Sequence, residues 1–196
     1  MTVARPARFS PTMRAVHWLT LMLITAAFGT AWTAHSGLAG EWFRPVLELH
    51  RSLGLTVLAL TVFRLVCRVR TLVPELPRDL HALQKFAARA TEALLYLLLL
   101  AQPVLGFLQT SARGQGVEFY FVMHLPPLLG IDRPLARQLH DWHALSANLL
   151  LLVIGMHSAA ALFHHFVRRD AVLDAMLPTR LRRGGASMVK KSSASA

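Results

Sequence analysis

The stretch Trp142–Val167, WHALSANLLLLVIGMHSAAALFHHFV, decides the fold of this 196-residue chain. Histidine is the only ionisable residue type in these 26 residues, which as a helix are long enough to cross a hydrocarbon core about 30 Å thick. Two further stretches, Ala15–Trp32 and Ala93–Ala112, also contain no Asp, Glu, Lys or Arg. A fourth span covers about Val46–Val66 if its terminal arginines reach the lipid headgroups. The sequence therefore predicts an all-α integral membrane protein, a four-helix bundle with four transmembrane helices.

The overall composition agrees with a membrane protein that contacts lipid. Hydrophobic residues make up 54% of the chain and charged residues 16%, whereas a soluble domain has roughly 25% charged residues. The net charge is +11, but the basic residues flank the apolar stretches and form no stripe interleaved with aromatic residues, so we expect no nucleic-acid partner. Cys67 is the one cysteine, which excludes an intrachain disulfide, an iron–sulfur cluster and a covalently attached haem.

The distribution of basic residues predicts the orientation in the membrane. Sixteen Lys and Arg residues belong to the two terminal segments and the connection between spans two and three, and five belong to the opposite side. Both termini are therefore expected in the cytoplasm. A cleaved signal peptide is the alternative for the first span, although its apolar run is longer than a usual signal core. We expect residues 1–180 to form the membrane domain and residues 181–196 a basic, disordered tail.

Six histidines lie within or at the ends of the spans, and the spacing of four of them, His17, His50, His143 and His157, predicts two sites. His143 and His157 are 14 residues apart, within about 40° of four helical turns, so they share one face about 21 Å apart along the axis. The span directions bring His50 to the outer level of His143, and His17 to the inner level of His157. Two neutral imidazoles that face each other across a bundle suit the iron of a non-covalent haem b. We therefore expect two haem b groups per chain, ligated by the pairs His17/His157 and His50/His143.

Other interpretations of these histidines stay open at this point. A buried histidine is often a hydrogen-bonded packing residue, and histidines in a membrane also bind protons or metal ions during transport. Zinc fits less well, because it needs more nitrogen, oxygen or sulfur ligands at each site. The small residues Gly54, Ala147 and Ala161 lie one turn from the proposed ligands and would leave room for a flat macrocycle, although small residues also serve helix packing.

Two arginines are candidate cofactor-binding residues at the inner level. Arg64 follows His50 by 14 residues, so it shares the face of His50 about 21 Å deeper. Arg14 precedes His17 by one turn. A haem propionate near hydrocarbon needs a charged or hydrogen-bonding partner, which either guanidinium provides. The alternative for Arg64 is that its side chain only extends to the cytoplasmic headgroups.

Four groups of residues together resemble prokaryotic cytochrome b561. They are Met13-Arg14-Ala15-Val16-His17-Trp18-Leu19, Leu49-His50-Arg51-Ser52-Leu53-Gly54, the last span from Trp142 to His165, and Arg169-Asp170 followed by Met176-Leu177-Pro178. The resemblance covers about Phe9–Arg180. It implies a multi-pass protein of the bacterial inner (cytoplasmic) membrane that is linked to quinone, and the most similar type is described as oxidising superoxide and reducing ubiquinone.

This resemblance gives two expectations for function. The first is an oxidoreductase that moves single electrons between an outer-side donor and membrane quinone, because a bis-histidine haem has no open iron position for oxygen activation. Outer-side arginines, if they are more than solvated charges, would attract an anionic donor such as superoxide; they are Arg51, Arg113, Arg133 and Arg137. The second is a cytochrome b anchor subunit that relays electrons from a separate dehydrogenase to quinone.

Overall fold

The computed structural model describes residues 8–74 and 79–177, so the expected tail 181–196 lies outside the described residues. Four long helices dominate this part of the chain: α1 (Pro11–His35), α2 (Phe43–Arg70), α3 (Ala82–Ala112) and α4 (Arg133–Phe163). Shorter elements are a 3₁₀ turn (Gly40–Trp42), strands β1 (Val117–Phe119) and β2 (Met123–Leu125), and a π-helical turn (His164–Arg168). All four long helices are long and apolar enough to cross a membrane, which confirms the predicted fold class.

The helices begin earlier than the charge-free stretches, and the starts of α1, α3 and α4 have their own capping residues. The Ser10 hydroxyl caps α1 and the Asp132 carboxylate caps α4, each by accepting a backbone N–H of the first turn. His81 and Gln84 form a reciprocal capping box on α3. As a result α3 begins 11 residues before Ala93, the predicted start. Absence of charge therefore marks the lipid-embedded part of a helix and not its full length.

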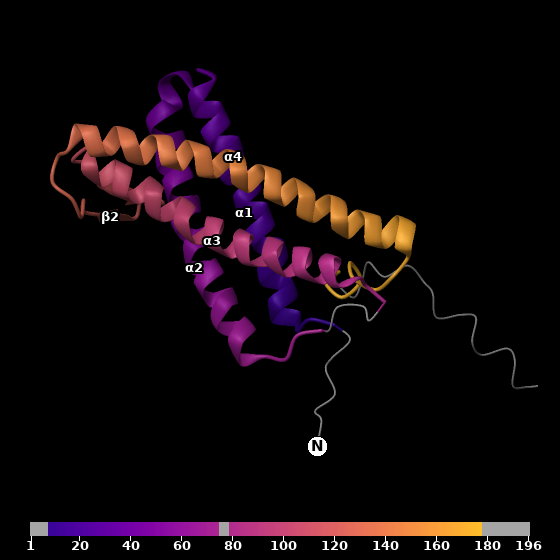
Figure 1. Cartoon of the computed structure of the whole chain (residues 1–196). Coiled ribbons are helices and arrows are strands. Elements are labelled where there is room, and N and C mark those ends of the chain that lie inside the picture. Colours follow the sequence, from indigo (N-terminus) through magenta and orange to yellow (C-terminus); the bar gives the residue numbers. More distant parts are fainter. Residues whose placement is uncertain (1–7, 75–78, 178–196) are drawn as a thin grey trace, which may run out of the picture.

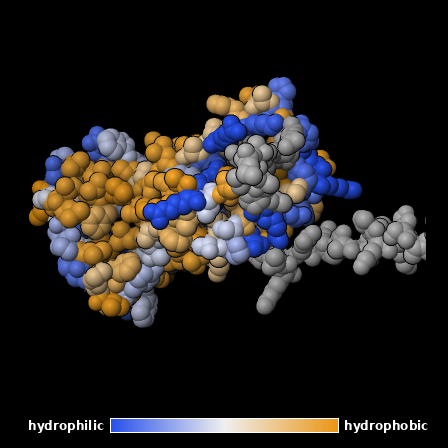
Figure 2. All heavy atoms as spheres, turned by 90° about the horizontal axis from the view of Figure 1, so that it is seen from below, coloured by the Kyte–Doolittle hydropathy of each residue, from blue (hydrophilic) through white to orange (hydrophobic). Residues whose placement is uncertain are grey.

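The helices form two antiparallel pairs. α1 packs along α2, α3 packs along α4, and the two pairs meet mainly through α2 and α3 (Figure 1). A core of buried aliphatic side chains joins all four helices; it consists of Ile24, Val57, Leu98, Leu99, Leu150 and Val153. Many other apolar side chains stay exposed, as expected for a surface in lipid, and they dominate the face in Figure 2, with hydrophilic side chains densest at one end.

One end of the bundle, the hairpin end, contains the end of α1, the start of α4 and the β1–β2 hairpin. The sequence predicts only a loop near Pro126-Pro127, yet β1 and β2 pair as antiparallel strands just before it. The turn residues Tyr120 and Phe121 have φ of 49° and 60°, which costs about 1–2 kcal/mol for each non-glycine residue. Ser52 and Thr56 offset this cost, because the Tyr120 backbone N–H donates to Ser52 Oγ (2.8 Å) and its hydroxyl pairs with Thr56 Oγ1 (2.9 Å).

The opposite end, the terminal end, contains the start of α1 and the chain that follows α4. Side chains of α1 and its preceding residues bind backbone carbonyls of that chain: Arg8 binds Leu177, Arg14 binds Leu177, and Trp18 binds Met176. The start of α1 and the segment after α4 are thus fastened to each other, and both lie at one end of the bundle, as an even number of spans requires.

Candidate functional site

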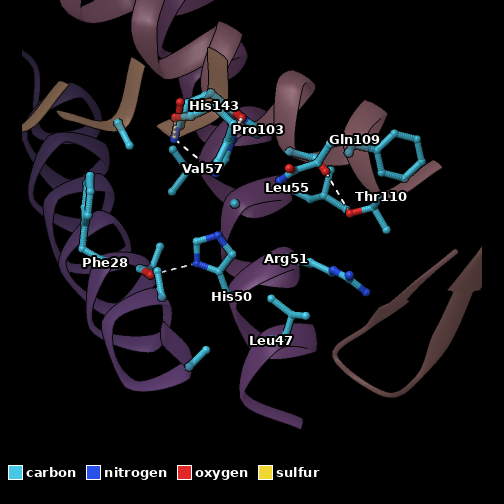
Figure 3. A pocket seen from close by; sticks show the side chains of 18 of the residues that line it. Phe28, Leu47, His50, Arg51, Leu55, Val57, Pro103, Gln109, Thr110 and His143 are labelled. Atoms are coloured by element: carbon cyan, nitrogen blue, oxygen red, sulfur yellow. Dashed lines mark hydrogen bonds between the residues drawn. The ribbon is translucent and has the colours of Figure 1, made fainter. Parts of the chain in front are cut away.

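His50 of α2 and His143 of α4 face each other between the two helix pairs. Their ring centroids are 6.3 Å apart and the ring planes are inclined by 85°. Both rings line a cavity of about 400 Å³, within the range of small-molecule and cofactor sites (Figure 3). Gly54 and Ala147 also line this cavity, so the small residues singled out in the sequence do border open space beside the two rings.

Each of these two rings is oriented by a backbone carbonyl. His50 Nδ1 lies 2.8 Å from the carbonyl oxygen of Ala27, and His143 Nδ1 lies 3.0 Å from that of Gln102. A carbonyl oxygen can only accept, so both Nδ1 atoms carry the proton and each Nε2 presents a lone pair. The lone pair of His143 Nε2 accepts from the Gln102 side-chain amide (3.3 Å). An Nδ1–H bonded to a carbonyl is the usual arrangement of a metal-binding histidine, because it fixes the ring and raises the basicity of Nε2.

Helix α3 holds the His143 ring from a second side. The Gln102 side-chain amide donates to the His143 carbonyl oxygen (3.1 Å), and its oxygen accepts from the Ser146 hydroxyl. Gly106 stands so near the ring that a Cβ there would come within 3.0 Å of His143 Cε1. The sequence did not lead us to expect a role for Gln102, and it predicted for Gly106, with Pro103, only a kink in the third span. A glutamine inside an apolar span was the available signal, since polar residues in membrane helices usually serve a function.

His17 of α1 and His157 of α4 form the second pair, toward the terminal end. Their centroids are 6.4 Å apart and their planes are inclined by 68°. The edge of Trp18 contacts His17, with centroids 5.4 Å apart. Among the residues that the structure describes, no side chain or carbonyl forms a hydrogen bond with either ring. The second pair therefore has the same spacing as the first without its polar anchors.

The spacing within both pairs fits a metal ion bound between two imidazoles. Two metal–nitrogen bonds of about 2 Å each, with about 1 Å from each nitrogen to its ring centre, place the centroids about 6 Å apart. Within residues 8–74 and 79–177, no cluster of three or more His, Cys, Asp or Glu side chains is arranged to hold a metal ion, which disfavours a zinc site. The donor set is thus suited to an iron whose other ligands come from a macrocycle.

Comparison with known proteins assigns the family. The family description "prokaryotic cytochrome b561" matches residues 8–179. Cytochrome b561 homolog 2 of Escherichia coli K12 is 31% identical over 176 residues, which cover 88% of this chain and 92% of that protein. The probable superoxide oxidase CybB of Yersinia pestis is 29% identical over 175 residues, covering 88% and 97%. Cytochrome b561 homolog 1 of E. coli K12 is 29% identical over 180 residues, covering 88% and 98%.

The chain belongs to the prokaryotic cytochrome b561 family. It is therefore a multi-pass membrane protein that transfers electrons as an oxidoreductase. The family implies haem b as its cofactor.

Membership of the cytochrome b561 family suggests a role for two half-buried arginines at the terminal end, Arg64 and Arg14. Arg64 of α2 lies close enough to interact electrostatically with both His17 and His157. Its Nε atom is buried and forms no hydrogen bond within the described residues. Arg14 donates through Nη1 to the Leu177 carbonyl oxygen (2.9 Å), and its Nε is likewise buried and unpaired there. Both arginines thus lie at the level of the His17/His157 pair, and the Nε–H of each has no hydrogen-bond partner among the described residues.

The remaining candidate residues are mostly engaged by protein partners. Arg51 pairs with Glu48 and also donates to Gln115, so part of its charge is neutralised. His140, which precedes His143 by one turn of α4, bonds to Gln109 (3.1 Å) and lines the same cavity. At the terminal end, His164 lies 2.6 Å from Asp170 and His165 lies 3.9 Å from Asp174. Arg113 lines the cavity beside His50 and His143.

Proposed function

We propose that this protein is a di-haem b electron carrier that passes single electrons between a donor at the hairpin end and membrane quinone. In this proposal His50 and His143 ligate one haem, and His17 and His157 ligate the other. The observation that supports it best is the presence of two imidazole pairs, 6.3 and 6.4 Å apart, at two levels of one continuous helix, α4. We further propose the bacterial inner membrane as the location, with both termini in the cytoplasm.

The protein's own residues would prepare both sites for electron transfer. Bound haem supplies a one-electron couple between ferric and ferrous iron. Ligation by two of these histidines would leave an iron no open position for oxygen, which favours electron transfer over oxygen binding. The carbonyls of Ala27 and Gln102 hold the rings of His50 and His143 in one orientation, so little rearrangement accompanies a change of charge. Arg14 and Arg64 would neutralise haem propionates near the second pair.

The donor that we propose is a small anion, with superoxide as the leading case, and the acceptor is ubiquinone. Arg113 borders the cavity at the hairpin end, and Arg133 and Arg137 begin α4 at the same end, so their positive charge would attract an anion there. Arg51 contributes less, because Glu48 pairs with it. A relative of similar length carries the name probable superoxide oxidase, which supports the same chemistry for this chain.

Haem content after single substitutions tests the ligand assignment. The purified protein should contain about two haems b per chain, with a Soret band that sharpens on reduction with dithionite. His50→Ala and His143→Ala should each remove the same haem, and His17→Ala and His157→Ala should each remove the other. His124→Ala is the matched control, because this exposed side chain bonds only to Glu118 on the hairpin and should leave both haems in place.

Two outcomes would contradict the proposal. The pairing is wrong if His17→Ala and His143→Ala remove the same haem, and a protein without visible absorption has no haem function. Superoxide consumption by purified protein with added ubiquinone tests the donor and acceptor. That reaction could fail while quinone is reduced only in the presence of a co-purified dehydrogenase. This result would instead favour the anchor-subunit function.

A further inference from the structure

Tyr96 of α3 has a hydroxyl group without a partner in the interior of the bundle. Its oxygen is buried, and none of the residues in the described ranges forms a hydrogen bond with it. A buried phenol hydroxyl in a native protein almost always has a hydrogen-bond partner, since leaving it unpaired costs about 1–3 kcal/mol. The sequence provides no need for a tyrosine here, where leucines precede and follow it. We therefore expect the Tyr96 hydroxyl to donate a hydrogen bond to an acceptor.

Arg64 of α2 stands beside Tyr96 with a second unused donor. The guanidinium carbon lies 5.6 Å from the Tyr96 ring centroid, near enough for the charge to interact with the phenol. Arg64 Nε is buried and also unpaired among the described residues. An N–H cannot accept a hydrogen bond, so the guanidinium cannot satisfy the proton of the hydroxyl. The phenol oxygen can still accept from the guanidinium, which lies within hydrogen-bonding range of it. The hydroxyl proton and the Arg64 Nε–H are two donors that lack an acceptor oxygen among the described residues.

The nearby carboxylate of the protein is already bound elsewhere. Glu92 interacts electrostatically with Tyr96, but its Oε2 accepts from Arg68 at 2.7 Å. Arg68 thus neutralises part of the charge of Glu92. The charge of Arg64 also acts on His17 and His157, so the two donors lie beside that histidine pair.

We propose that Tyr96 Oη and Arg64 Nε donate together to one carboxylate of the group bound between His17 and His157. This inference rests on the proposed function, in which that group is a haem with propionate side chains. Tyr96 would then be a positioning residue, acting on the redox balance of one haem through its carboxylate. Donation by both groups lowers the negative charge that the iron senses, which favours the reduced form at this site alone.

A spectroelectrochemical titration of Tyr96→Phe tests this assignment with little change in shape. The equilibrium constant for reduction of the His17/His157 haem should fall at least about threefold, or about 30 mV for a one-electron couple. The redox-induced infrared difference spectrum should show a shifted carboxylate band. Tyr120→Phe is the matched control, because the Tyr120 hydroxyl pairs with Thr56 at the hairpin end. In this variant the potential of the His17/His157 haem should match that of the parent protein.

A double-mutant cycle with Arg64→Lys tests whether the two donors share one acceptor. Lysine keeps the positive charge but lacks the Nε–H, and the combined shift with Tyr96→Phe should differ from the sum of the single shifts. Additive shifts would overturn the shared acceptor. An unchanged potential and infrared spectrum in Tyr96→Phe, with both haems bound, would overturn the role of Tyr96.

The same variants separate a carboxylate from the other acceptor oxygen available in the membrane, a quinone carbonyl. A raised KM for quinone with unchanged haem potentials would overturn the carboxylate assignment. Absence of haem from the parent protein would refute the proposed function itself, so the two failures are distinguishable.

Discussion

At the level of single residues, the two histidine pairs differ in how their rings are held. Both rings of the His50/His143 pair donate to backbone carbonyls, whereas His17 and His157 lie near Trp18 and the charge of Arg64 and form no hydrogen bond among the described residues. A ring without a polar anchor keeps more rotational freedom before a metal binds. We therefore expect the His17/His157 site to lose its haem first under mild denaturation, because its ligands are less pre-oriented.

Gly106→Ala should disturb the better-anchored site. The new methyl group would come within 3.0 Å of His143 Cε1, and the ring cannot retreat without lengthening its bond to the Gln102 carbonyl. We expect a changed low-spin electron paramagnetic resonance signal and weaker haem retention at this site only. Gly29→Ala is the control, because nothing lies within 4 Å of its added carbon and alanine favours the helix by about 1 kcal/mol. Equal behaviour of the two variants would contradict the steric role of Gly106.

Arg64→Gln should lower the potential of the His17/His157 haem and leave the other haem nearly unchanged. A positive charge favours the more electron-rich reduced iron, so its removal disfavours reduction. A redox titration measures both haems in one sample. If both midpoints match the parent, Arg64 serves only to anchor α2 at the headgroups.

At the level of elements, the segment after α4 stabilises the terminal end. Asp170 lies where this segment turns back, and it accepts hydrogen bonds from His164 and Arg168 and from the Val172 backbone N–H. Arg168 also pairs with Asp79, which precedes α3. Partial burial on its own raises the pKa of Asp170, but these hydrogen bonds, with that to His164 the strongest, outweigh it and lower the pKa below the ordinary 3.8.

This lowered pKa predicts that the segment after α4 is sensitive to acid. Because folding favours the ionised carboxylate, its stabilisation is fully present above about pH 3.8 and is lost as the pH falls through the folded pKa. Asp170→Asn should reduce stability near neutral pH by about 1 kcal/mol, a few degrees in Tm, and flatten the acid dependence. Thermal unfolding followed by circular dichroism at several pH values measures this. Asp79→Asn, whose carboxylate is 69% exposed, should have little effect, and an equal loss in both variants would contradict the argument.

At the level of the whole molecule, the sequence predicted most of the architecture, because a membrane imposes simple rules on it. Three spans follow from charge-free length, and the second span follows once its terminal arginines are allowed to reach the headgroups. The sharing of one face by His143 and His157 follows from helical periodicity. The long-range contacts could not be predicted. Gly106 approaches His143, and Tyr96 lies beside Arg64, only because of how α3 packs on its neighbours. The hairpin was missed because its turn uses Tyr120 and Phe121 in place of glycine or asparagine.

The orientation of the whole bundle is a separate prediction. Sixteen basic residues against five assign the terminal end to the cytoplasm. A reporter fused after residue 196 should be active if it requires the cytoplasm and inactive if it requires export. The same reporter fused in the connection between α3 and α4 should give the reverse pattern. Activity of an export-dependent reporter at the C-terminus would overturn the orientation.

The continuity of α4 has an electrical consequence. Its two proposed ligands, His143 and His157, are 14 residues apart, so the two proposed haem levels are separated by about 21 Å, roughly two thirds of the hydrocarbon thickness. In the proposed orientation, an electron that enters at the hairpin end moves toward the negative side of an energised membrane. Each 100 mV of membrane potential then opposes the transfer by about 1.5 kcal/mol. Electron flow from an outer donor to the inner haem should therefore slow as the cell builds its membrane potential and quicken when an uncoupler collapses it.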